Sequence, residues 1–118
     1  MSAEPSSLSD SEYRQLSGAV LAGIEAEIDR WLEGDVIDID AQRTGGLLEL
    51  TLPQGSKIVV NTQPPLHEIW LAARSGGHHF RYADGQWRDT RDGSEFFAVL
   101  SRCASEQAGL ALRFTAAD

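Results

Sequence analysis

The chain has a single cysteine, Cys103, so no disulfide can form within it. Such cysteine usage is typical of proteins that fold in a reducing compartment. No run of about 18 apolar residues is present, which argues against a membrane-spanning helix. The first ten residues, MSAEPSSLSD, have neither a basic segment nor an apolar core, so we predict no signal peptide. Together these absences favour a cytoplasmic protein.

Basic residues are scarce at the start of the chain. Residues 1–40 contain ten acids and two bases, whereas residues 41–118 contain eight of each. The net charge of −8 therefore lies entirely in the first third. Nucleic acids and anionic membranes repel such a segment, so neither is expected as a partner. Cations, or a protein with a basic patch, are the partners that this charge favours.

Most of these acids are concentrated at residues 24–40, which read IEAEIDRWLEGDVIDID. Glu25, Asp29 and Glu33 follow one another at four-residue spacing, so on a helix they are neighbours that repel by a few tenths of a kcal/mol per pair. The helix macrodipole also disfavours anions near a helix C-terminus. These carboxylates therefore destabilise the helix, and no local interaction offsets the cost. Such unfavourable residues tend to mark a functional site.

Two segments have the spacing of amphipathic helices. Between residues 10 and 32, apolar side chains recur every three or four positions: Tyr13, Leu16, Val20, Ile24, Ile28 and Trp31. Ser9 and Glu12 have capping-box spacing, and Gly34 is a plausible stop. A second apolar stripe runs from Phe96 to Ala104 and closes at Gly109, with Asp92 in the position of its N-cap.

Short alternating segments with strand period lie between the helices, around Ile37–Ile39, Leu48–Leu52, Ile58–Val60, Ile69–Leu71, Phe80–Tyr82 and Trp87. The breaks between them carry turn residues: Gly45-Gly46, Pro53-Gln54-Gly55, Pro64-Pro65, Gly76-Gly77 and Asp84-Gly85. Short connections favour an antiparallel meander. Two helices on one face of that sheet would bury every apolar stripe. We therefore predict an α+β two-layer sandwich: two terminal helices packed on one face of a roughly six-stranded antiparallel sheet.

Strand parity divides the residues of this sheet between its two faces. Ile58, Val60, Ile69 and Leu71 share the inward face, and Trp31, Phe80 and Trp87 are also expected in the core. Asn61 and Trp70 must then point outward, and Gln63 continues their face if the strand reaches it. Trp70 is either a contact anchor for a partner or a cover for Leu47 or Val59.

Residues 55–80 read GSKIVVNTQPPLHEIWLAARSGGHHF. This run resembles the bacterial frataxin family of the CyaY type, whose Asn-x-Gln-x-Pro-Leu…Trp-Leu-Ala pattern matches the segment from Asn61 to Ala72. The likeness extends from LSDSEYRQL, at the start of the first helix, to EQAG near the end of the second. It implies a single frataxin-like domain over residues 1–118, with residues 1–8 as a frayed N-terminal tail.

The resemblance also implies a function. Members are small acidic proteins that bind iron (Fe²⁺ or Fe³⁺) weakly and exchangeably, and other divalent cations could bind in its place. They dock on the cysteine desulfurase and the scaffold of iron–sulfur cluster assembly, as regulators rather than enzymes, and we expect a monomer. The family's acidic ridge corresponds here to Glu25, Asp29, Glu33, Asp35, Asp38 and Asp40. Its partner-binding sheet residues correspond to Asn61, Gln63 and Trp70.

One departure from the family leaves the number of iron sites open: Ala26 and Arg30 stand where a second carboxylate is common. The runner-up interpretation is an acidic protein-interaction module or inhibitor with no specific metal role. Catalysis ranks third, because no catalytic triad or phosphate-binding loop is evident. His78 and His79 point to opposite faces of a strand, so together they cannot hold one metal.

Overall fold

The computed structural model describes residues 8–116. Its elements in chain order are α1 (Asp10–Glu33), β1 (Asp40–Thr44), β2 (Leu47–Thr51), β3 (Lys57–Gln63), the short 3₁₀ helix η1 (Pro64–Leu66), β4 (Glu68–Ala73), β5 (Gly76–Ala83), β6 (Gln86–Asp89) and α2 (Phe96–Ala108). Residues 1–7 of the predicted tail lie outside the described part. Leu8, the last residue of that tail, is half-buried against the core.

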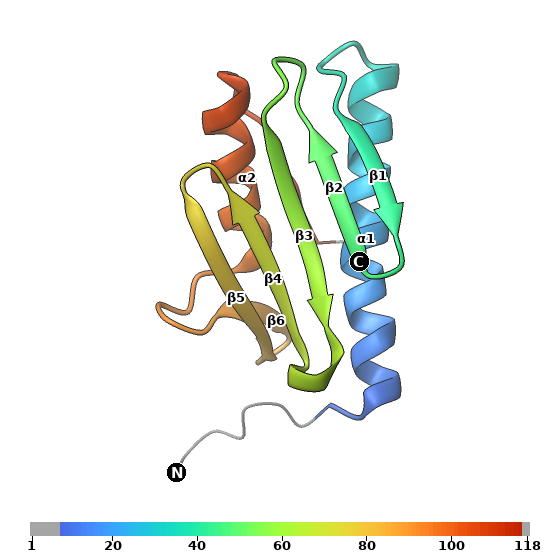
Figure 1. Ribbon diagram of the computed structural model, residues 1–118, viewed down its shortest axis with the longest axis vertical. Coiled ribbons are helices and arrows are strands. Elements are labelled where there is room, and N and C mark those ends of the chain that lie inside the picture. Colours follow the sequence, from blue (N-terminus) through green and yellow to red (C-terminus); the bar gives the residue numbers. More distant parts are fainter. Residues whose placement is uncertain (1–7, 117–118) are drawn as a thin grey trace.

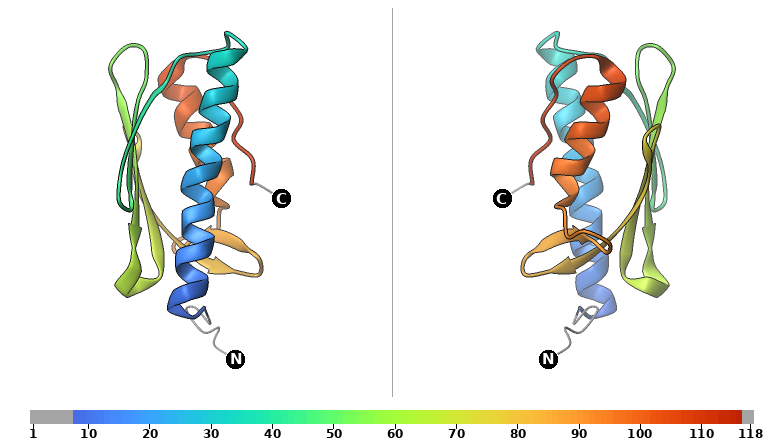
Figure 2. Two further views of the ribbon diagram at one scale, coloured as in Figure 1. Left: turned by 90° about the vertical axis from the view of Figure 1, so that its right-hand side faces the viewer. Right: turned by 90° about the vertical axis from the view of Figure 1, so that its left-hand side faces the viewer.

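The strands form one six-stranded antiparallel sheet in the order β1-β2-β3-β4-β5-β6 (Figure 1). Both helices lie on the same face of this sheet, and Figure 2 shows the other face uncovered by any element. The predicted two-layer α+β architecture is confirmed. Strands that are neighbours in sequence are also neighbours in the sheet, because every connection between them is short.

The core lies between the sheet and the two helices. Trp31, Phe80 and Trp87 are buried as predicted, and the inward strand residues Ile58 and Ile69 are completely inaccessible. Cys103 is a free, buried thiol of α2. Within residues 8–116, no helix is long and apolar enough to cross a membrane.

The two helix starts differ in how well the sequence predicted them. Ser9 and Glu12 form the expected capping box of α1, with both reciprocal hydrogen bonds present. The expected cap of α2 was wrong. Glu95 is its N-cap and accepts from the N–H groups of Phe97 and Ala98. Asp92 instead accepts from the N–H of Ser94 and closes the preceding turn, because a short acidic side chain can cap either structure.

Two strand details also differ from expectation. The first strand was expected around Ile37–Ile39, but β1 begins at Asp40 and is polar except for Ala41. β1 lies at the edge of the sheet and pairs only with β2, and edge strands often carry charged side chains. Gly76-Gly77 was expected as a turn, yet both glycines belong to β5 and the turn is Arg74-Ser75. The side chain of Gln107 anchors this turn by accepting from the N–H of Arg74.

Candidate functional site

The six carboxylates predicted to bind metal lie along the second half of α1, in the connection that follows it, and at the start of β1. We call them the acidic ridge: Glu25, Asp29, Glu33, Asp35, Asp38 and Asp40. All are exposed except Glu25, which is half-buried. The C-terminal end of α1 and the beginning of β1 lie at the same end of the molecule, which places residues 29–40 together (Figure 1).

Basic residues neutralise only part of this region. Glu25 accepts from Arg43 of β1 at 2.6 Å, an ion pair that joins α1 to the edge strand. Arg30 donates to Glu27 at 2.8 Å, and this hydrogen bond raises the pKa of the Arg30 guanidinium. Within residues 8–116, the other five carboxylates of the acidic ridge have no ion pair. The ridge therefore keeps most of its negative charge available to solvent.

The end of α1 turns the chain sharply within the acidic ridge. The N–H of Val36 bonds to the carbonyl of Trp31 at 2.8 Å, and Asp35 adopts a left-handed conformation with φ 58°. Non-glycine residues rarely adopt this conformation, although Asp is one of the residues that tolerate it. The turn brings Asp35 and Asp38 next to the end of α1, where Leu32 and Ile37 line a shallow hollow with them.

The donor chemistry of the acidic ridge suits weak metal binding. Carboxylate oxygens are hard ligands that accept iron, manganese, calcium or magnesium. Among residues 8–116, however, no three His, Cys, Asp or Glu side chains converge into a group that could hold an ion. The residues fit a shallow and exchangeable cation surface rather than a closed cage.

The second candidate surface is the uncovered face of the sheet. Asn61 and Trp70 face each other across β3 and β4 as parity predicted, and with Gln63 they are partly exposed. The indole of Trp70 stacks on the imidazole of His79 at 4.1 Å between ring centroids. The ring that stacks on Trp70 is thus His79, a neighbour that the sequence did not suggest. A shallow hollow of about 190 Å³ beside this pair is lined in part by Val59, Asn61 and Ala72.

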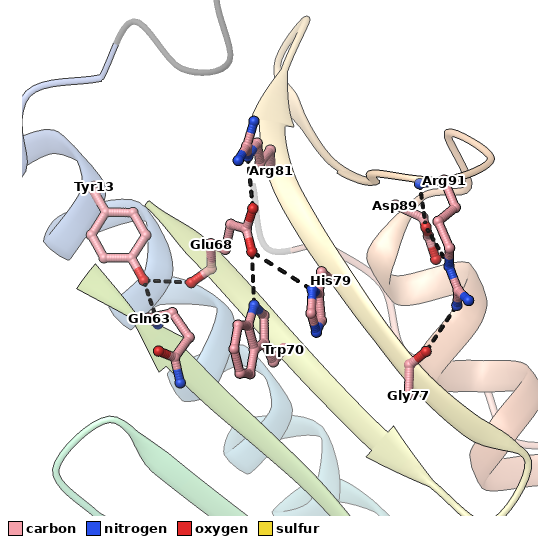
Figure 3. A network of polar contacts seen from close by, with 9 residues as sticks. All are labelled: Tyr13, Gln63, Glu68, Trp70, Gly77, His79, Arg81, Asp89 and Arg91. Atoms are coloured by element: carbon pink, nitrogen blue, oxygen red, sulfur yellow. Dashed lines mark hydrogen bonds and ion pairs between the residues drawn. The ribbon is translucent and has the colours of Figure 1, made fainter. Parts of the chain in front are cut away.

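Glu68 is the residue of this surface that sequence reasoning missed. It shares the outward parity of Trp70, yet its side chain is only 6% exposed. Its carboxylate accepts from the indole N–H of Trp70 at 2.8 Å and from Nε of Arg81 at 2.7 Å (Figure 3). Nδ1 of His79 lies 3.9 Å from the same carboxylate. The sequence held one signal for this pair, because Glu68 and Arg81 carry opposite charges on neighbouring segments with strand period. The register between those two strands, which places the residues opposite each other, was not predicted.

Tyr13 ties the start of α1 to the ends of the two central strands. Its buried hydroxyl donates to the carbonyl of Glu68 at 2.6 Å and accepts from the N–H of Gln63 at 3.0 Å (Figure 3). Burial raises the pKa of the Tyr13 hydroxyl. His67 stacks on the Tyr13 ring and lies 2.7 Å from Asp10. His67 is therefore a partnered histidine with a structural role.

His78 and His79 lie on opposite faces, as predicted. Whereas His79 belongs to the uncovered face, His78 contacts the carboxylate of Asp89 at 2.9 Å on the helix side. Asp89 is nearly inaccessible and also accepts from the N–H of Arg91, whose guanidinium donates to the carbonyl of Gly77 (Figure 3). These contacts anchor the loop that leads into α2, so this cluster has a structural role.

Comparison with protein families identifies relatives over nearly the whole chain. A family model described as a frataxin-like domain matches residues 6–110. Curated proteins from Burkholderia mallei and Burkholderia pseudomallei, both named iron–sulfur cluster assembly protein CyaY, are 50% identical over 109 residues. The alignment covers 92% of this chain and 100% of each relative.

Solved structures give the same result for the fold. A frataxin from Psychromonas ingrahamii has a TM-score of 0.81 and 36% identity, covering 92% of this chain and 99% of that one. A trimeric frataxin from Saccharomyces cerevisiae, complexed with ferrous, has a TM-score of 0.67 and 23% identity. That alignment covers 92% of this chain and 89% of the yeast chain. At this lower identity the yeast structure supports the fold alone.

Proposed function

Because the chain belongs to the frataxin family, we propose that it is an iron-binding accessory protein of iron–sulfur cluster assembly. Curated relatives with 50% identity over their whole length carry that assembly role in their names. We propose that the protein regulates cluster production and does not itself catalyse a reaction. The surfaces described above are well suited to binding, and the chemistry of each supports a different part of this function.

The acidic ridge is proposed to bind iron as cargo. Its exposed oxygen donors suit Fe²⁺ or Fe³⁺ and also admit other divalent cations. Because no three of the described acidic, His or Cys side chains form a metal cage, binding is expected to be weak and exchangeable. A yeast frataxin was solved in complex with ferrous, but at 23% identity it supports the fold alone, and its trimer does not define the oligomeric state of this chain. We retain the expectation of a monomer.

The uncovered sheet face is proposed to bind two partners, the cysteine desulfurase and the scaffold protein of iron–sulfur cluster assembly. Trp70 presents a large, partly exposed aromatic surface, stacked on His79 and bordered by Asn61. Trp is enriched in interface hot spots because it buries much area for little lost conformational freedom. The acidic ridge is expected to steer the encounter with a basic patch, since rim charges mainly set association rates.

The single observation that carries this proposal is an uncovered sheet face with a preorganised Trp70 beside a largely uncompensated acidic ridge. A pull-down with the cysteine desulfurase of the same organism, with and without Fe²⁺, tests it. We expect stoichiometric capture of the desulfurase. Absence of capture in both conditions would contradict the docking role.

The alternative function is an acidic interaction module or inhibitor with no specific metal role. The lack of a closed metal cage within residues 8–116 is the observation that favours it. An Fe²⁺ titration distinguishes the two functions. Saturable binding that is lost when Glu25, Asp29 and Glu33 are neutralised supports the iron-binding proposal, whereas a non-saturable response supports the alternative.

A further inference from the structure

We infer that Glu68 is a positioning residue, whose buried carboxylate fixes the orientation of Trp70 on the uncovered sheet face. This inference rests on the proposed docking function of that face. It concerns a residue whose side chain is only 6% exposed and so offers a partner almost no surface of its own. Its effect on docking must therefore pass through its neighbours.

The carboxylate uses its two oxygens for two different donors. Oε1 accepts from the indole N–H of Trp70 at 2.8 Å, and Oε2 accepts from Nε of Arg81 at 2.7 Å. Hydrogen bonds to an ionised acceptor are stronger than those between neutral groups. Burying a carboxylate is costly unless it is paired, and Arg81 supplies that compensation. The ion pair with Arg81 thus holds the acceptor for the indole in place.

The indole is held from a second direction by His79. The two rings are nearly parallel, with an interplanar angle of 8°, and Nδ1 of His79 lies 3.9 Å from Oε1 of Glu68. Glu68 therefore borders both rings of the stack (Figure 3). Trp70 and His79 lie opposite each other on β4 and β5, and Arg81 lies opposite Glu68, so the cluster is built on paired strands rather than on loops.

A side chain held in its bound orientation loses less conformational entropy when a partner docks. An exposed Trp on a flat sheet would otherwise sample several rotamers, and each ordered side chain costs free energy on binding. Glu68 removes that freedom before the encounter. The side chain of Arg81 itself stays partly exposed on this face.

The test uses Glu68→Gln in the full chain, measured for binding to the purified cysteine desulfurase. Glutamine keeps the size of the side chain but replaces one acceptor oxygen by a donor, so Trp70 and Arg81 can no longer both be bound. We expect about a tenfold weaker Kd, mainly through faster dissociation, as for loss of one charged hydrogen bond. Glu106→Gln is the matched control, because it removes the same charge from an exposed position of α2, on the other side of the sheet, and should leave the Kd nearly unchanged.

A spectroscopic readout separates positioning from general destabilisation. In a proton–nitrogen correlation spectrum, the indole N–H signal of Trp70 should shift and exchange faster in Glu68→Gln. The indole signals of Trp31 and Trp87, which are buried on the helix side, should stay in place. Should Glu68→Gln fail to fold, Arg81→Gln replaces it, since Arg81 is partly exposed and its loss frees the carboxylate. A smaller weakening of binding and a smaller Trp70 shift are then expected.

The outcomes distinguish this inference from the docking proposal. If Trp70→Ala weakens binding but Glu68→Gln neither weakens binding nor moves the Trp70 signal, Glu68 has no positioning role. If Trp70→Ala binds as well as the parent, the docking proposal fails. The Trp70 indole signal in Glu68→Gln then decides alone whether the carboxylate orients the ring.

Discussion

Replacing Tyr13 by Phe tests how the start of α1 is fixed to the sheet. The ring stays in its packing site against His67 and Trp87, and only the hydroxyl is lost. Two hydrogen bonds disappear, which leaves the carbonyl of Glu68 and the N–H of Gln63 without this partner. A fully buried group left unsatisfied costs about 1–3 kcal/mol. Because the bond to Gln63 is only partly buried, we expect a loss in the lower part of the summed range, about 2–4 kcal/mol in the free energy of unfolding.

Urea unfolding monitored by circular dichroism measures this loss. In a thermal melt it corresponds to a decrease of about 10 °C in Tm. Tyr82→Phe is the matched control, because Tyr82 packs edge-on against Trp87 and its hydroxyl has no hydrogen bond recorded within residues 8–116. A loss below about 0.5 kcal/mol for Tyr13→Phe, within the range of ordinary surface substitutions, would refute the reasoning.

The same hydroxyl predicts how stability changes in alkali. Burial raises the pKa of Tyr13 above its ordinary value of 10.0, so the folded protein holds this proton more tightly than the unfolded chain. The resulting stability is fully present below the ordinary pKa and is lost as pH rises through the raised pKa. Tyr13→Phe should therefore lose less stability than the parent above about pH 10. If the free energy of unfolding falls equally with pH in both proteins above about pH 10, the prediction is wrong.

Two further predictions concern the charges of α1. Replacing Asp29 and Glu33 by Asn and Gln should stabilise the metal-free protein by about 0.5–2 kcal/mol in urea unfolding, because it removes like-charge and macrodipole repulsion. Glu25→Gln should give no such gain, since it breaks the ion pair with Arg43. If the double variant at Asp29 and Glu33 is less stable than the parent, those two carboxylates make stabilising hydrogen bonds and the reasoning is wrong. Hydrogen bonds from Ser9 lower the pKa of Glu12, so the stability they provide should be lost as pH falls through that pKa. Glu12→Gln should flatten the acid limb of stability against pH, and an unchanged limb would contradict the cap's role.

The fold was predictable because its apolar patterns are strong. The period of α1 and the capping box at Ser9 placed the first helix within a residue of its observed bounds. Strand parity also placed Trp70 and Ile69 on the correct faces. The edge strand β1 was misplaced because its residues, Asp40–Thr44, include a single apolar side chain, Ala41, and so show no alternation. Edge strands beside solvent are specified by backbone pairing more than by side chains, so composition reveals them poorly.

The candidate site was predictable only in part. The carboxylates of the acidic ridge and the outward Trp70 follow from spacing, parity and the family resemblance. The buried Glu68 does not, because its burial depends on Arg81 and His79, which come from a strand whose register the sequence leaves open. Partners that meet across strands are set by three-dimensional pairing, and single-sequence patterns carry little of that information.

The most direct test of the account is the kinetics of binding to the cysteine desulfurase at two salt concentrations. Trp70→Ala should weaken binding by about 2 kcal/mol or more through faster dissociation, as expected for a hot spot, and should leave Fe²⁺ binding almost unchanged. Neutralising Glu25, Asp29 and Glu33 together should instead slow association at low salt and weaken Fe²⁺ binding. Desulfurase binding by Trp70→Ala with the rates of the parent would contradict the central claim.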